Sequence, residues 1–121
     1  MANELDGRIA VVTGAARGIG RAIALELAGM GAITALLARD RSALQTLAEE
    51  IAAAGGQAAV FPCDLTDSAA LDKTGAEILS RYKRCDILVN NAGIGIMGKP
   101  LHQTSPGDWE RTINTNLRAP F

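Results

Sequence analysis

The stretch Thr13-Gly14-Ala15-Ala16-Arg17-Gly18-Ile19-Gly20 lies between an apolar run at residues 8–12, which predicts a β-strand, and an amphipathic run at residues 21–30, which predicts a helix. Glycines lack a Cβ, so a turn built from them exposes backbone N–H groups at the start of the helix. Those N–H groups and the positive end of the helix dipole favour phosphate. The glycines are spaced G-x-x-x-G-x-G rather than G-x-G-x-x-G. The stretch therefore predicts a nucleotide phosphate site with its own characteristic spacing.

Strand and helix patterns alternate along the rest of the chain. Three more apolar runs predict strands at residues 32–38, 57–62 and 86–90. Helical patterns fill the intervals, and the candidate capping residues are Asp40 or Ser42 for the second helix and Thr66 or Asp67 for the third. This alternation predicts an α/β fold: a doubly wound parallel sheet of the Rossmann type, with strands in the order 3-2-1-4 and helices on both faces.

Large apolar side chains at helical spacing predict which helix faces are buried. For the first helix they are Ile19, Ile23, Leu27 and Met30, and for the third they are Leu71, Ile78, Leu79 and Tyr82. A further helix is expected from Ser105. Because the fourth strand would lie at an open edge, residues 1–121 are expected to form the N-terminal dinucleotide-binding part of a single Rossmann-type domain whose second half is absent.

The composition argues against several classes of function. Of the 121 residues 48% are apolar, and 12 basic residues against 13 acidic ones give a net charge of −1. This balance provides no field for binding nucleic acid or an anionic membrane. No apolar run approaches the ~20 residues of a membrane span, so a cytoplasmic location is expected. No residues stand at metal-ligand spacing, and Cys63 and Cys85 are expected to be reduced and unpaired.

Ligands of an open parallel sheet bind beyond the carboxyl ends of its strands, where the strand order reverses. The segments expected to meet there are residues 13–20, 38–40, 63–65 and 90–95. After the second strand of such a sheet, an arginine suits a 2′-phosphate and an acidic residue suits a 2′-hydroxyl. Arg39 comes before Asp40 there, and Arg17 adds a second positive charge, so we expect NADP(H) to be favoured over NAD(H). The alternative is that both arginines are ordinary surface residues and Asp40 only caps a helix.

Three features at these places resemble the short-chain dehydrogenase/reductase family. They are Thr13-Gly14-x-x-x-Gly18-x-Gly20, Asn90-Asn91-Ala92-Gly93 and Asp64 after the third strand. The glycine spacing is similar to that of the compact branch, and the chain resembles reductases of the 3-oxoacyl-carrier-protein reductase type.

The resemblance also implies roles for individual residues. Those implied to line the cofactor are Gly14, Arg17, Ile19 and Gly20. Those implied to flank its adenine are Asp64 and Leu65, and those beside the ribose and nicotinamide are Asn91, Ala92 and Gly93. Gly18 and Arg39 complete the predicted cofactor site.

The family uses an asparagine, a serine, a tyrosine and a lysine for catalysis. Asn116 matches the asparagine, whose backbone carbonyl helps to hold a water in a proton relay, and Pro120 has no N–H to donate to that carbonyl. The alternative is that Asn116 is a core asparagine bonded to neighbouring backbone. Tyr82 is the only tyrosine, and Asp86 stands four residues after it, so the Tyr-x-x-x-Lys motif is missing from these residues.

Two functions remain open at this point. The first is an NADP(H)-dependent oxidoreductase that interconverts a carbonyl and an alcohol of a small-molecule substrate by hydride transfer, represented by its cofactor-binding half. The second is a truncated, non-catalytic nucleotide-binding module. The 121-residue chain alone is expected to be inactive, and the resemblance implies a homo-oligomer for the complete enzyme.

Overall fold

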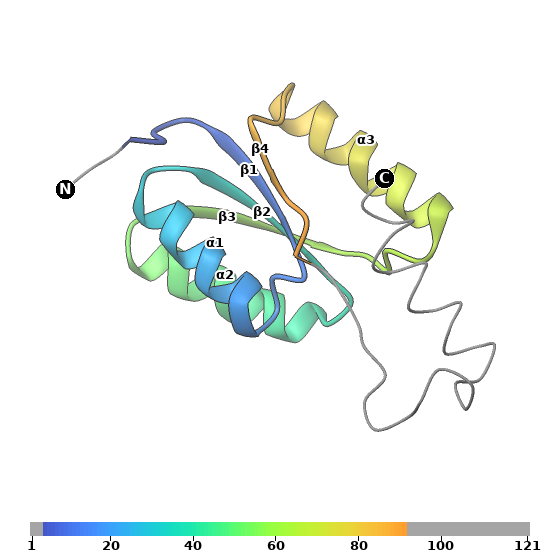
Figure 1. The fold of residues 1–121 in the computed structure, drawn as a ribbon, viewed down its shortest axis with the longest axis horizontal. Coiled ribbons are helices and arrows are strands. Elements are labelled where there is room, and N and C mark those ends of the chain that lie inside the picture. The colour runs from blue at the N-terminus through green and yellow to red at the C-terminus, as the bar shows by residue number, and fades with distance from the viewer. Residues whose placement is uncertain (1–3, 92–121) are drawn as a thin grey trace, which may run out of the picture.

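The computed structural model describes residues 4–91, in which strands and helices alternate as predicted (Figure 1). The strands are β1 (Ile9–Thr13), β2 (Ile33–Ala38), β3 (Gln57–Pro62) and β4 (Ile87–Val89). The helices are α1 (Gly18–Gly29), α2 (Arg41–Ala53) and α3 (Ser68–Tyr82). The largest differences from the predicted bounds are that α1 begins at Gly18 instead of Arg21 and that β4 is shorter than residues 86–90. In addition, β1 is shifted by one residue from 8–12, β2 begins one residue later than 32, and α1 ends one residue before 30.

The strands form one parallel sheet in the order β3-β2-β1-β4, which confirms the predicted topology. At the centre of the sheet Val12 lies beside Leu36 on one side and Val89 on the other. Helices α1 and α2 cover one face and α3 covers the opposite face (Figure 1). A right-handed crossover explains this division, because the connection to β4 runs across the sheet in the opposite direction from the connections to β2 and β3.

The sheet has a hydrophobic core on each face, and alternate residues of the central strands point into one core or the other. Val12 and Leu36 are fully buried against α1 and α2, whereas Val11 and Leu37 pack on the α3 side with Ile78. The apolar strands are therefore covered on both faces, as continuous runs of Val, Ile, Leu and Ala predict for a parallel sheet.

The buried face of α1 was predicted correctly only in part. The small residues Gly20, Ala24 and Ala28 are buried. Of the predicted stripe, Leu27 packs partly buried against the core, whereas Ile19 is 72% exposed. The predicted stripe that begins at Ile19 and the buried stripe that begins at Gly20 both repeat with helical spacing. The prediction chose the stripe with the larger side chains. The short side chains let the helix approach the strands closely, and this is the arrangement that the fold adopts.

The buried face of α3 was predicted correctly only in part. Ile78 is buried, and Tyr82 packs partly buried against the same core. Leu79, however, is 60% exposed, and Thr74 takes a buried position one turn before Ile78. Ile78 and Leu79 are neighbours along the helix, so a rotation of about 100° decides which of them faces the core.

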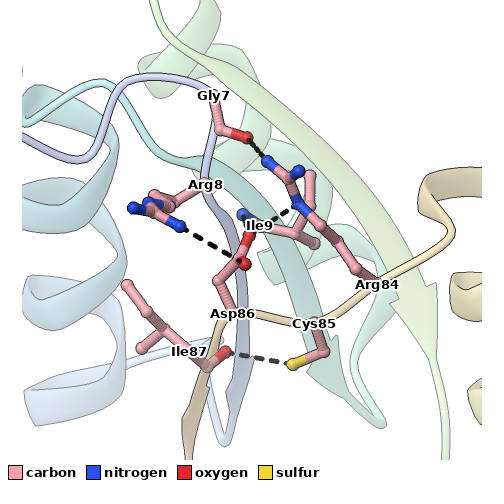
Figure 2. Close-up of polar contacts among 7 residues, drawn as sticks. All are labelled: Gly7, Arg8, Ile9, Arg84, Cys85, Asp86 and Ile87. Atoms are coloured by element: carbon pink, nitrogen blue, oxygen red, sulfur yellow. Dashed lines mark hydrogen bonds and ion pairs between the residues drawn. The ribbon is translucent and has the colours of Figure 1, made fainter.

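Asp86 fastens the start of β4 to the start of β1 (Figure 2). Its carboxylate accepts a hydrogen bond from the Ile9 N–H at 2.8 Å and one from Arg84 Nε at 2.9 Å. Arg8 adds a longer ion pair at 3.8 Å, and Arg84 also donates to the carbonyl of Gly7 at 2.8 Å. The Ile9 hydrogen bond is the largest cause of a lowered pKa at Asp86, and the positive charges of Arg84 and Arg8 contribute further. Residues 77 positions apart in the chain are thus joined at the end of the sheet opposite the glycine turn.

Replacing Asp86 with asparagine should destabilise the fold at neutral pH and flatten its response to acid. The carboxylate has a lower pKa in the fold than its usual 3.8, so its stabilising effect is complete above about pH 4 and is lost as pH falls through the folded pKa. Urea denaturation at pH 7 and pH 3 should show a larger difference in midpoint between wild type and Asp86→Asn at pH 7. The same difference at both pH values would contradict this role.

Candidate functional site

The described parts of the four predicted segments, which include only residues 90 and 91 of segment 90–95, are linked by hydrogen bonds at the carboxyl ends of the strands. The N–H of Ala15 in the glycine turn donates to the Leu37 carbonyl of β2 at 3.2 Å. The N–H of Cys63, after β3, donates to the Ala38 carbonyl at 2.8 Å. The Asn91 side chain, after β4, donates to the Gly14 carbonyl at 3.2 Å. All four strands therefore end in loops that are tied to one another at the predicted edge.

The glycine turn has the backbone conformation that its glycines were predicted to supply. Gly14 and Gly18 have φ values of 64° and 62°, in the left-handed region that favours glycine. A Cβ on Gly20 would overlap the Gly14 carbonyl oxygen and the Asn91 amide nitrogen. Gly20 is therefore required by close approach, and Gly14 and Gly18 by conformation.

Helix α1 begins differently from the other two helices. Asp40 caps α2 by accepting from the Ala43 N–H at 3.1 Å, and Asp67 caps α3 by accepting from the Ala70 N–H at 3.2 Å. The N-cap residue of α1 is Arg17, whose side chain makes no capping hydrogen bond. Arg17, Gly18 and Ile19 are also exposed. The N-terminus of α1 thus combines an uncapped backbone with a positive side chain, which suits an anionic ligand.

Thr13 and Asn91 form the joint between the glycine turn and β4. The Thr13 hydroxyl donates to the Val89 carbonyl at 3.2 Å and accepts from the Asn91 N–H at 3.0 Å. With the Asn91 amide bonded to Gly14, these contacts hold the turn in register with β4. The role of Thr13 was missed from the sequence, where its only signal is a polar residue at the end of an apolar strand. Asn91 was predicted beside the cofactor, and the structure shows that its side chain supports the turn.

Arg39 and Asp64 stand on neighbouring loops and both are exposed. The Asp64 carboxylate accepts from the Thr66 hydroxyl at 2.7 Å and from the Thr66 N–H at 3.0 Å. These two hydrogen bonds are the largest causes of a lowered pKa at Asp64; burial opposes them, and the positive charge of Arg39 makes the smallest contribution, which lowers the pKa further. Thr66 therefore positions Asp64. Of the two residues predicted to cap α3, Thr66 and Asp67, Asp67 is the one that does so.

Leu65 packs partly buried against the core on the α3 side of the sheet. It also borders a groove of about 470 Å³ between α3 and the sheet, which includes the exposed side chains of Leu79 and Leu88. The Asn90 residue lines the same groove. Leu65 therefore anchors the loop that carries Asp64, and its place beside the adenine stays a prediction.

Some predicted features fall outside the described part of the chain. These are Ala92, Gly93, Asn116 and the helix expected from Ser105. Within residues 4–91 there is no group of three or more His, Cys, Asp or Glu side chains placed to hold a metal ion. In the same range no helix has the length and apolarity needed to cross a bilayer. Cys63 is buried, Cys85 is exposed, and both are free thiols as predicted.

Comparison with known proteins gives the same family from sequence and from structure. Residues 8–121 match the family described as short chain dehydrogenase. A fatty acyl-CoA reductase of Acinetobacter baylyi is 40% identical over 115 residues, which are 93% of this chain and 39% of the relative.

Solved structures are similar over nearly the whole chain. A metagenomic short-chain oxidoreductase in complex with NADP has a TM-score of 0.93 and 49% identity, over 95% of this chain and 52% of that one. A 3-ketoacyl-(acyl-carrier-protein) reductase from Brucella melitensis, complexed with NADH, has a TM-score of 0.87 and 32% identity, over 96% and 46%. The chain spans about half the length of these structures. With its glycine turn, its strand order and the match over residues 8–121, the chain belongs to the short-chain dehydrogenase family.

Proposed function

We propose that this chain is the cofactor-binding part of an NADP(H)-dependent oxidoreductase that interconverts a carbonyl and an alcohol by hydride transfer. The observation that carries the proposal is the start of α1, where exposed glycine backbone meets a positively charged N-cap without a capping side chain. A pyrophosphate placed there would accept hydrogen bonds from N–H groups to which, within residues 4–91, no capping side chain is bonded. When bound, the nicotinamide supplies the hydride chemistry, and the protein supplies position and charge.

The proposed cofactor site follows the loops from the turn outward. Gly14, Gly18 and Gly20 shape the phosphate turn, and Asn91 supports it from β4. Exposed Ile19 borders the same end of α1. Asp64 lies on the adenosine side of the site, next to the loop of Arg39. Ala92, Gly93 and the proposed catalytic residue Asn116 complete the assignment from the sequence.

Arg39 supports a preference for NADP(H) over NAD(H). It is exposed and directly follows β2, where the adenosine ribose of a dinucleotide lies in a doubly wound fold. Within the described ranges Arg39 makes no ion pair, so its guanidinium is available to a 2′-phosphate. An arginine can bind phosphate through two parallel hydrogen bonds, which a ribose hydroxyl cannot match.

Replacing Arg39 with alanine should weaken NADPH binding about tenfold and change NADH binding less than about twofold, because a charge-assisted phosphate contact contributes about 1.5 kcal/mol or more. Fluorescence titration of the 121-residue chain with each cofactor measures both affinities. Arg81→Ala is the matched control, since it removes the same charge from the exposed last turn of α3. Equal losses for NADPH and NADH, or tighter wild-type binding of NADH than of NADPH, would contradict the preference.

The alternative function is a nucleotide-binding module without catalysis. In residues 1–121 the single tyrosine, Tyr82, is followed four positions later by Asp86. Both functions require dinucleotide binding, and they differ in turnover. The 121-residue chain should be inactive under both functions. The oxidoreductase predicts oxidation of NADPH with a ketone by the whole polypeptide of the source reading frame, whereas the module predicts that this whole polypeptide binds NADPH without turnover.

A further inference from the structure

Arg39 and Asp64 lie on adjacent loops because their strands are paired up to their last residues. Ala38, the end of β2, is in register with Pro62, the end of β3. The hydrogen bond from Cys63 N–H to the Ala38 carbonyl, at 2.8 Å, continues this pairing past the strands. Arg39 follows directly after Ala38, and Asp64 follows directly after Cys63. The two opposite charges are thus carried into the same region by rigid parts of the fold.

Asp64 is held in place more firmly than an ordinary surface carboxylate. One of its oxygens, Oδ1, accepts from both the hydroxyl and the N–H of Thr66, at 2.7 and 3.0 Å. This local turn removes part of the rotational freedom that exposed carboxylates have. The second oxygen makes no hydrogen bond within residues 4–91. The negative charge is therefore fixed beside the loop that carries Arg39.

The two charges act on each other without forming an ion pair. The hydrogen bonds from Thr66 are the largest causes of the lowered pKa of Asp64, and the positive charge of Arg39 adds a smaller effect in the same direction, so Asp64 is ionised at neutral pH. By the same Coulomb interaction, the Asp64 charge weakens the positive potential that Arg39 presents to an anion. The 2′-phosphate of NADP(H) would bind to an Arg39 whose positive charge is partly offset by Asp64. The 2′-hydroxyl of NAD(H) is uncharged, so Asp64 would not repel it.

Building on the function proposed above, we propose that Asp64 is a specificity-determining residue that limits the preference for NADP(H) by opposing the cofactor's 2′-phosphate at Arg39. The effect is confined to the 2′ position, because adenine, pyrophosphate and nicotinamide are common to the two cofactors. Any change that Asp64 causes at those shared groups cancels when the two affinities are compared as a ratio.

The test is the ratio of NADPH to NADH affinity in Asp64→Asn. Asparagine has nearly the same shape and can still accept both hydrogen bonds from Thr66. At low ionic strength the ratio should rise about two- to fivefold, the range expected for one charge near a phosphate in water. The rise should shrink at about 0.5 M salt, where charges on the surface are screened.

Asp67→Asn is the matched control. It removes the same charge from a residue three positions further along, and asparagine caps a helix as well as aspartate does. Its ratio should match that of wild type.

Failure of the inference about Asp64 can be distinguished from failure of the proposed function on which it rests. An unchanged or lower ratio in Asp64→Asn overturns the inference and leaves the proposed function intact, provided that wild type binds NADPH. An equal rise in Asp67→Asn, or a rise that salt does not reduce, also overturns it. A wild-type chain that binds neither cofactor overturns the proposed function and the inference together.

Discussion

A Gly20→Ala chain should lose dinucleotide binding by about 100-fold or more and should unfold about 3 kcal/mol more easily than wild type. The added methyl would overlap the Gly14 carbonyl oxygen and the Asn91 amide, and would come within 2.9 Å of the Gly14 carbonyl carbon. The carbonyl belongs to the backbone of the turn, so the turn itself must move. That movement separates Gly14 from Asn91 and misaligns the N–H groups at the start of α1.

Gly29→Ala is the control for Gly20→Ala. Gly29 is the last residue of the same helix, and a Cβ there would have no neighbour within 4 Å. Alanine at this position should be neutral or stabilising by up to about 1 kcal/mol, because it favours the helix. Urea denaturation and NADPH titration of both variants check the pair. Similar stability and similar binding in the two variants would show that Gly20 does not hold the turn.

An Ala24→Leu chain should be destabilised by about 1–3 kcal/mol, the usual cost of adding methylenes to a packed core. Ala24 is fully buried and lies in the middle of the stripe by which α1 contacts the sheet, in the same cluster as Val12 and Leu36. A leucine there would push α1 away from the strands. Because α1 carries the phosphate turn at its start, NADPH binding should weaken as well.

Ala22→Leu makes the same change on the exposed side of the same helix. Its free energy of unfolding should remain within about 0.5 kcal/mol of wild type. Denaturation midpoints of the two variants therefore report which side of α1 packs on the sheet. A larger loss in Ala22→Leu than in Ala24→Leu would contradict the face seen in the structure.

The strand order could be predicted from the sequence because it depends on few facts. Apolar runs separated by helical patterns require parallel strands, and the handedness of crossovers then restricts the arrangement of the sheet. The phosphate turn could be predicted from the glycines at 14, 18 and 20, because the structure requires glycine at each of these positions. Gly14 and Gly18 have positive φ, and Gly20 has no room for a Cβ. These signals are local, or depend on a rule with few exceptions.

The remaining features depend on contacts between distant residues. The joint between Thr13 and Asn91 spans 78 positions, and the bond between Ile9 and Asp86 spans 77. No periodicity marks either pair in the sequence. The face of α1 was predicted only in part: Leu27 packs against the core, but apolar size also favours Ile19, which is exposed, over Ala24, which is fully buried. Side-chain size along one helix does not reveal how closely that helix approaches its sheet.

The most direct test of the central claim is to locate the cofactor on the protein. Two-dimensional amide spectra of the ¹⁵N-labelled 121-residue chain, recorded during titration with NADPH, report each backbone N–H separately. The largest shifts should fall on Gly14 to Gly20, with smaller ones at Arg39 and Asp64 and none at Lys83 and Arg84 near the opposite end of β4. Saturable shifts confined to α3 and its groove, with residues 14–20 unchanged, would contradict a cofactor site at the glycine turn.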